Sequence, residues 1–149
     1  MKVIPHNITG FLDANRVASV CFNNESNNPY CVPCFFVFDA QHRLMLFKSS
    51  HGAYHEDYIR SVTDVAGSVL PEQLDPLKMK GLQFTGKTLP QAEIEGLQLE
   101  LVYYKKFPIG RKMPGYIWAI RPDFFKFTDN THGFGSKTVW SAFSLQREF

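Results

Sequence analysis

Short hydrophobic runs, separated by polar turns, recur along the chain and are typical of β-strands. We expect seven strands, over residues 17–22, 30–38, 44–48, 65–70, 78–87, 116–121 and 124–128. A polar loop and a tight turn separate the first three, which indicates an antiparallel meander. The fold class is therefore predicted to be mainly β.

Three further segments have the pattern of helices. Residues 5–14 carry an apolar face, and residues 53–62 follow two serines that can cap a helix. The clearest helix is predicted over 91–106, where hydrophobic residues recur at intervals of three and four: Ile94, Leu97, Leu101 and Tyr104. The residues after 128 are predicted to form a glycine-rich tail. So many strands exceed what one open two-layer sheet needs, and the pattern favours a small antiparallel barrel with flanking helices.

Composition limits the possible classes of protein. A length of 149 residues with 44% hydrophobic content suits a single domain over residues 1–149, and an aromatic content of 15% excludes disorder. The net charge of +2 is too small to attract nucleic acid, although residues 1–104 carry −3 and residues 105–149 carry +5. No stretch approaches the ~20 apolar residues of a membrane helix. Because the first residues also lack the apolar core of a signal peptide, we expect a cytoplasmic protein with neither a membrane nor a nucleic-acid partner.

The motif Cys31-Val-Pro-Cys34 could be a redox dithiol or half of a zinc site. It lies within a strand pattern, however, and residues three apart on a strand face opposite sides. Only three cysteines are present, so no second pair completes a four-cysteine site, and the odd number argues against a disulfide-rich secreted scaffold. A structural role is favoured, with Pro33 marking a strand edge or a bulge.

A cluster suited to an anion follows the third strand. It consists of Lys48, Ser49, Ser50, His51 and His55. A cation, two hydroxyl groups and the start of a helix can together stabilise a phosphate group. The alternative is an ordinary capped helix with two solvated histidines.

The end of the chain offers a third candidate site. Gly133 and Gly135 permit close approach of the backbone to a ligand, and Phe134 and Trp140 could stack on a planar ring with Lys137 beside it. The alternative is a surface loop whose aromatic side chains anchor the tail on the barrel.

Three segments carry a resemblance to a known family: Lys80-Gly-Leu-Gln-Phe-Thr-Gly86, Lys105-Lys-Phe-Pro108 and the stretch from Trp118 to Trp140. With them the chain resembles the flavin-binding split-barrel proteins related to pyridoxamine 5′-phosphate oxidase, and within these the YhbP-like branch. The resemblance spans almost the whole chain. It implies a six-stranded antiparallel split β-barrel, a homodimer, and FMN in two clefts at the dimer interface.

The resemblance also implies which residues contact FMN. The phosphate would be held by Lys48, Ser49, Ser50 and His55, and the ring would lie against Pro33, Cys34 and Phe35. Lys137 and Trp140 match the place where the oxidases bring a basic residue and a tryptophan towards the cofactor. The arginine that grips the phosphate in the oxidases is absent, and their substrate-binding Arg and His pattern is not recognisable. The substrate of the oxidases is therefore not predicted.

The predicted function is that of an FMN-binding oxidoreductase acting on an unknown small molecule, in which the flavin performs the electron chemistry. The alternative is a flavin- or haem-binding module without catalytic activity, in which His51, His55 or His132 could ligate haem iron. A split barrel whose cofactor site is vestigial is a third interpretation.

Overall fold

The computed structural model describes residues 2–49, 63–131, 133 and 135–143. The strands are β1 (Val17–Asn23), β2 (Pro29–Asp39), β3 (Leu44–Ser49), β4 (Asp64–Val69), β5 (Lys80–Thr88), β6 (Tyr116–Asp129) and β7 (Lys137–Ser141). The helices are α1 (His6–Ala14), α3 (Gln91–Glu95), α4 (Leu99–Lys106) and the short 3-10 helix η1 (Pro108–Lys112). The helix predicted over residues 53–62 lies outside the described residues. Among those described, no helix is long and apolar enough to cross a membrane.

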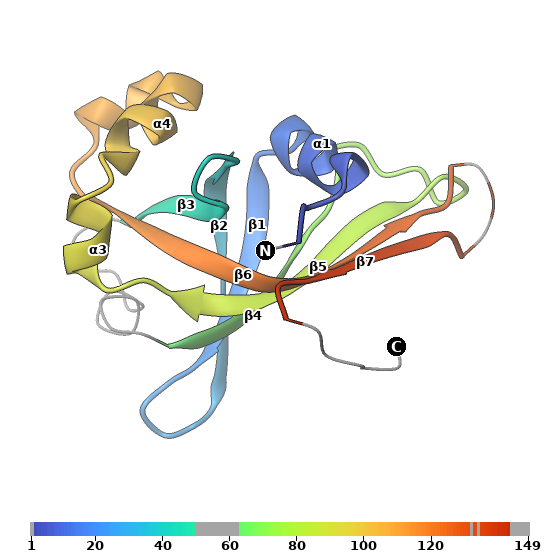
Figure 1. Cartoon of the computed structure of the whole chain (residues 1–149), viewed down its shortest axis with the longest axis horizontal. Coiled ribbons are helices and arrows are strands. Elements are labelled where there is room, and N and C mark those ends of the chain that lie inside the picture. The colour runs from blue at the N-terminus through green and yellow to red at the C-terminus, as the bar shows by residue number, and fades with distance from the viewer. Residues whose placement is uncertain (1, 50–62, 132, 134, 144–149) are drawn as a thin grey trace.

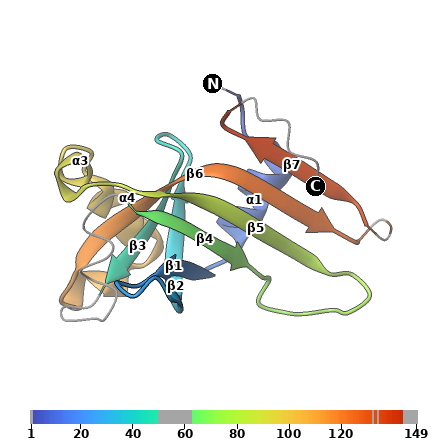
Figure 2. The same ribbon diagram turned by 90° about the horizontal axis from the view of Figure 1, so that it is seen from below.

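The strands form an antiparallel sheet in the order β3-β2-β1-β4-β5-β6-β7. Pairing of β3 with β6 closes the first six strands into a barrel, and β7 extends the sheet beyond β6. The predicted six-stranded barrel is therefore confirmed. Figure 1 shows α1 close to the barrel, while α3 and α4 lie towards one end of β6. Figure 2 shows that β7 flanks the opposite end of β6.

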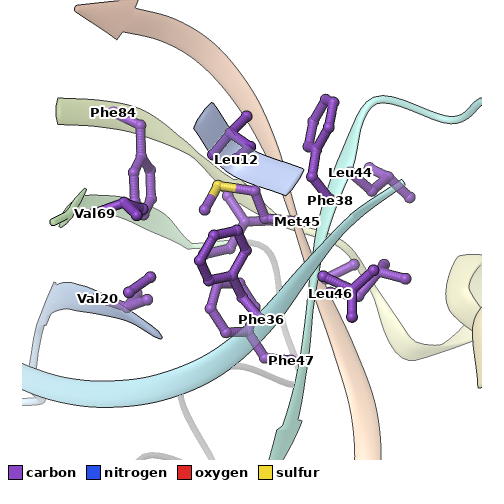
Figure 3. Packing of buried hydrophobic residues seen from close by; sticks show 14 of the residues in the cluster. Leu12, Val20, Phe36, Phe38, Leu44, Met45, Leu46, Phe47, Val69 and Phe84 are labelled. Atoms are coloured by element: carbon purple, nitrogen blue, oxygen red, sulfur yellow. The ribbon is translucent and has the colours of Figure 1, made fainter. Parts of the chain in front are cut away.

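The barrel interior is filled by hydrophobic side chains, many of them aromatic (Figure 3). Phe47 of β3 stacks on Trp118 of β6 with ring centroids 4.5 Å apart, across the strand pair that closes the barrel. Helix α1 adds Ile8, Phe11 and Leu12, the face predicted from the sequence. Because side chains fill a small barrel, a ligand has to bind outside this core.

The single helix predicted over 91–106 is wrong: the segment forms two helices, α3 and α4. The break includes Gln98, whose φ of 52° is left-handed and ends helical continuity. Beyond the break the buried residues are Leu99 and Tyr103, whereas Leu101 is 59% exposed. The break changes the helical phase, so the predicted stripe does not continue into α4.

The C-terminal strands also differ from the prediction. Residues 116–121 and 124–128 belong to one strand of 14 residues, β6, which continues through Pro122. A register shift between Thr85 and Gly86 of β5 lies opposite this position and accommodates the residue that lacks an N–H. The residues predicted as a tail contain β7. The structure therefore has seven strands, as predicted, but the last two predicted strands are one strand and the last observed strand was not predicted.

Candidate functional site

The main candidate site is a cavity of about 480 Å³ beside β2, at the end of β3 and under η1. Its volume is within the range of small-molecule sites, roughly 300–1,000 Å³. The residues that line it come from five parts of the chain: Arg16, Pro33, Cys34, Phe35, Lys48, Ser49, Tyr103, Phe107, Ile109, Gly110, Met113 and Pro114. Most of this surface is apolar, with cationic side chains at Arg16 and Lys48. Such a cavity suits a planar organic ligand that carries an anionic group.

The structure brings together five of the nine residues predicted to bind a cofactor. They are Pro33, Cys34 and Phe35 of β2 and Lys48 and Ser49 of β3. Their roles towards a ligand stay predictions. The sequence analysis did not identify Arg16 or the wall formed by residues 103–114. For that wall, the motif Lys105-Lys-Phe-Pro108 was the available signal, since it marks the segment that leads from α4 into η1.

The β2 side of the cavity has an exposed aromatic surface. Phe35 is 57% exposed although it lies within a strand, and its ring packs against Phe107 with centroids 5.5 Å apart. Pro33 is opposite Ser19 of β1 and has no N–H to donate. The two side chains therefore present an apolar surface next to a strand backbone.

Lys48 supplies a positive charge at the end of β3. Its Nζ donates hydrogen bonds to the hydroxyl of Tyr104 (2.7 Å) and to the carbonyl oxygen of Gly110 (2.5 Å), and lies 4.8 Å from the centre of the Tyr104 ring. Among the residues that the structure describes, neither hydrogen-bond partner is a carboxylate. The charge therefore remains available to an anionic group that enters the cavity.

The end of β3 is held in place by a close backbone contact. Ser49 is paired with Tyr116 of β6 and is 1% exposed. Gly115, which precedes Tyr116, has φ +142°, and a Cβ at this position would lie 1.9 Å from the Ser49 carbonyl oxygen. Only glycine fits this approach. The contact fixes the position of Ser49, and with it that of the neighbouring Lys48.

Arg16 forms the second cationic part of the lining. Its guanidinium donates two hydrogen bonds to the Glu72 carboxylate, which holds the pKa of Glu72 below its usual value. Lys106 lies nearby and donates to the carbonyl oxygen of Asn15 (2.9 Å), and its burial lowers the pKa of the amine. These contacts anchor α4 to the chain between α1 and β1.

Two further groups of the lining are neutral at ordinary pH. Burial raises the pKa of the Cys34 thiol to about 12 and that of the Tyr103 phenol to about 12. Cys34 is therefore a thiol rather than a thiolate. Cys31 is exposed on β2, so the two cysteines of the motif differ in surroundings, as a strand predicts.

Of the four remaining predicted residues, two lie outside the described residues and two are described but do not line the cavity. Ser50 and His55 lie outside the described residues, as do His51 and His132. Lys137 and Trp140 belong to β7 and do not line the cavity. Trp140 is buried against Phe125, with ring centroids 5.5 Å apart, and its Nε1 donates to the carbonyl oxygen of Lys2 (3.2 Å). A contribution of β7 to the cavity of a second copy stays a prediction.

Comparison by sequence identifies relatives over nearly the full length. The chain is 32% identical to the UPF0306 protein YhbP of Salmonella arizonae over 136 residues, which cover 89% of this chain and 90% of that protein. No family model matches the chain.

Comparison by structure gives neighbours with the same fold. A FAD-binding protein of Mesorhizobium loti has a TM-score of 0.62 at 18% identity, over 85% of this chain and 95% of that one. A protein of the pyridoxinephosphate oxidase family from Clostridium acetobutylicum has a TM-score of 0.58 at 13% identity, over 91% and 92%. A heme binding protein of Mycobacterium smegmatis has a TM-score of 0.62 at 14% identity, over 94% and 60%. The fold is therefore the split barrel of flavin- and haem-binding proteins.

Proposed function

The chain belongs to the UPF0306 family of YhbP proteins, and from this premise we propose that it is a homodimeric, cytoplasmic flavoprotein whose single split-barrel domain binds FMN and oxidises or reduces a small molecule. One observation carries the proposal. The cavity places the exposed aromatic surface of β2 next to Lys48, a cation whose two hydrogen-bond partners in the described part of the chain are uncharged.

The residues of the cavity fit the two parts of FMN. The isoalloxazine ring needs a flat apolar surface, which Phe35 and Pro33 provide beside the backbone of β2. The phosphate needs donors and positive charge, which Lys48 and Ser49 provide at the end of β3. Bound FMN would supply the electron-transfer chemistry.

The protein's own groups would orient the cofactor and exclude water. Binding of the phosphate would exchange the hydrogen bond from Lys48 to the neutral carbonyl of Gly110 for one in which both donor and acceptor are charged. Phe35 and Phe107 would limit the entry of water between β2 and η1. The neutral thiol of Cys34 adds no negative charge that would oppose the binding of an anion.

Exposed hydrophobic side chains at the cavity rim support the dimer. Phe35, Ile109 and Met113 are 57%, 74% and 57% exposed, and all three line the cavity. Apolar side chains that gather in one place on a surface mark an interaction site. A second copy packed on this rim would cover them and close the cavity.

The proposal is tested by FMN binding to the purified protein. We expect oxidised-flavin absorption bands that stay with the protein after gel filtration. Lys48→Ala should weaken FMN binding at least about tenfold, since one charge-assisted hydrogen bond contributes about 1.5–3 kcal/mol. The control is Lys78→Ala, which removes an exposed lysine that does not line the cavity. Equal affinities of the two variants would rule out the phosphate site.

A haem-binding module is the second candidate, because the cavity is largely apolar and one structural neighbour is a heme binding protein. No histidine occurs among the lining residues in the described part of the chain. Haem titration of the wild type and of His55→Ala distinguishes the two functions. A Soret band that depends on His55, together with no retained flavin, would favour the module.

A further inference from the structure

We propose that Cys21 and Cys31 form an oxidisable dithiol that closes to a disulfide between β1 and β2 when it reacts with a peroxide. The two residues are direct partners in the β1–β2 ladder. The two cysteines of the motif Cys31-Val-Pro-Cys34 therefore do not act together, because Cys31 pairs with Cys21 across the sheet rather than with Cys34 along the strand. The inference goes beyond the proposed function and does not depend on FMN.

The hydrogen bonds of the ladder show that the pair has suitable backbone geometry. The N–H of Phe36 donates to the carbonyl oxygen of Arg16 (2.9 Å), so these opposite residues form a hydrogen-bonded pair. Hydrogen-bonded and non-hydrogen-bonded pairs alternate along an antiparallel ladder. Cys21 is an odd number of positions beyond Arg16 and therefore belongs to a non-hydrogen-bonded pair. Pro33, which has no N–H, occupies a position of the same class opposite Ser19.

This class of pair brings the two cysteines within bonding range. The Cα atoms of a non-hydrogen-bonded pair are about 4.5 Å apart, and disulfides join Cα atoms about 4.4–6.8 Å apart. Side chains of directly opposite residues lie on the same face of the sheet. Closing the bond therefore requires rotation of the two side chains but little movement of the backbone.

The surroundings of the three cysteines distinguish this pair from Cys34. Cys31 is exposed and Cys21 is half-buried, so an oxidant can reach the pair from solvent. Burial, followed by a hydrogen bond with the Cys31 thiol, raises the pKa of Cys21 to about 11. Cys34 is also partly buried, but it packs against the core and lines the cavity instead.

The reaction consumes one hydrogen peroxide. The Cys31 sulfur, after losing its proton, attacks one peroxide oxygen; the O–O bond breaks and gives a Cys31 sulfenic acid and water. The Cys21 sulfur, having lost its own proton, then attacks the Cys31 sulfur, so that the S–S bond forms and the S–O bond breaks. Hydroxide leaves and takes up the proton as a second water. Two thiols are oxidised and the peroxide is reduced.

Peptide mapping of the full chain tests the pair. No Lys or Arg lies between residues 17 and 42, so trypsin leaves all three cysteines in one peptide, whereas cleavage after Glu25 separates Cys21 from the other two. The native protein is treated with hydrogen peroxide, blocked with N-ethylmaleimide, digested without reduction by a glutamate-specific protease and analysed by mass spectrometry. Wild type, Cys21→Ser, Cys31→Ser and the control Cys34→Ser are compared.

We expect wild type to lose two of its three free thiols and to yield the fragment before residue 26 joined to the fragment after it. Cys34→Ser should give the same joined pair, Cys21→Ser and Cys31→Ser should not, and dithiothreitol should restore the thiols. A bond within the second fragment, a joined pair that persists in Cys31→Ser, or a disulfide between two chains would overturn the proposal. The proposal would also be overturned if all three thiols of the native wild type stayed free after peroxide treatment while the same chain in denaturant was oxidised.

Discussion

Replacing Gly115 by alanine tests whether the contact between β6 and β3 positions the cavity. Gly115 immediately precedes β6 and has φ +142°, a conformation that residues with a side chain rarely adopt. A Cβ there would lie 1.9 Å from the carbonyl oxygen of Ser49 and 3.4 Å from Cε of Lys48. The substitution therefore forces the end of β3 away from β6.

The expected cost has two parts. A residue with a side chain in a rarely populated backbone region costs about 1–3 kcal/mol. Forcing an extra methyl group against a packed backbone costs typically about 1–3 kcal/mol more. We expect the free energy of unfolding to fall by about 3 kcal/mol and Tm to fall by roughly 6–12 °C for a chain of this size. FMN binding should also weaken, because Ser49 and Lys48 move with the end of the strand.

The matched control is Gly133→Ala. Gly133 has φ +147°, close to that of Gly115, but a Cβ there meets no atom of the described residues within 4 Å. Gly133→Ala introduces the backbone strain without the steric contact. The difference between the two variants in the free energy of unfolding, measured in urea, therefore gives the cost of the contact with Ser49. Equal losses of stability in the two variants, or unchanged FMN binding by Gly115→Ala, would refute the reasoning.

Two further predictions concern partly buried polar groups. Lys106→Ala should lower the free energy of unfolding by about 1–2 kcal/mol, because it removes the hydrogen bond to Asn15. The control is Lys105→Ala, which removes an exposed lysine. Equal urea midpoints of the two variants would count against a stabilising role of Lys106. Burial raises the pKa of Cys34 from 9.0 to about 12, so the unfolded thiol ionises first and stability should fall as pH rises from about 9 towards 12. The fall should be smaller in Cys34→Ala, and equal slopes of stability against pH would contradict the burial of this thiol.

Most of the barrel could be predicted because its strands are short apolar runs bounded by turns. The end of β3 was predicted to be a site from its anion-suited residues Lys48 and Ser49, whereas the cavity-lining part of β2 was predicted only from the resemblance to split-barrel flavoproteins. The left-handed conformation of Gln98 was not visible, since glutamine is an ordinary helix former, although Gly96, which caps α3, was an available signal of the break. Periodicity that continues across such a break predicts the wrong buried face.

Features that depend on pairing between distant segments could not be predicted. Strand β7 buries one side chain deeply, Trp140, so its sequence carries little of the alternation that marks a strand. The cavity wall from Tyr103 to Pro114 and the pair formed by Cys21 and Cys31 depend on helix packing and on strand register. One sequence does not determine register, because a shift of one residue changes the face and the partner of every side chain.

The closure of the barrel by β3 and β6 has a consequence for folding kinetics. Met45 pairs with Ile120, so the two strands that close the barrel are far apart in the sequence. Bringing them together has a large cost in loop-closure entropy. We expect the meander of β1 to β3 to form early and this closure to come late. Because the cavity needs both the end of β3 and the segment that leads into β6, ligand binding is expected to appear only with the last phase of refolding. During synthesis, likewise, a competent site cannot exist until the residues of β6 have left the ribosome.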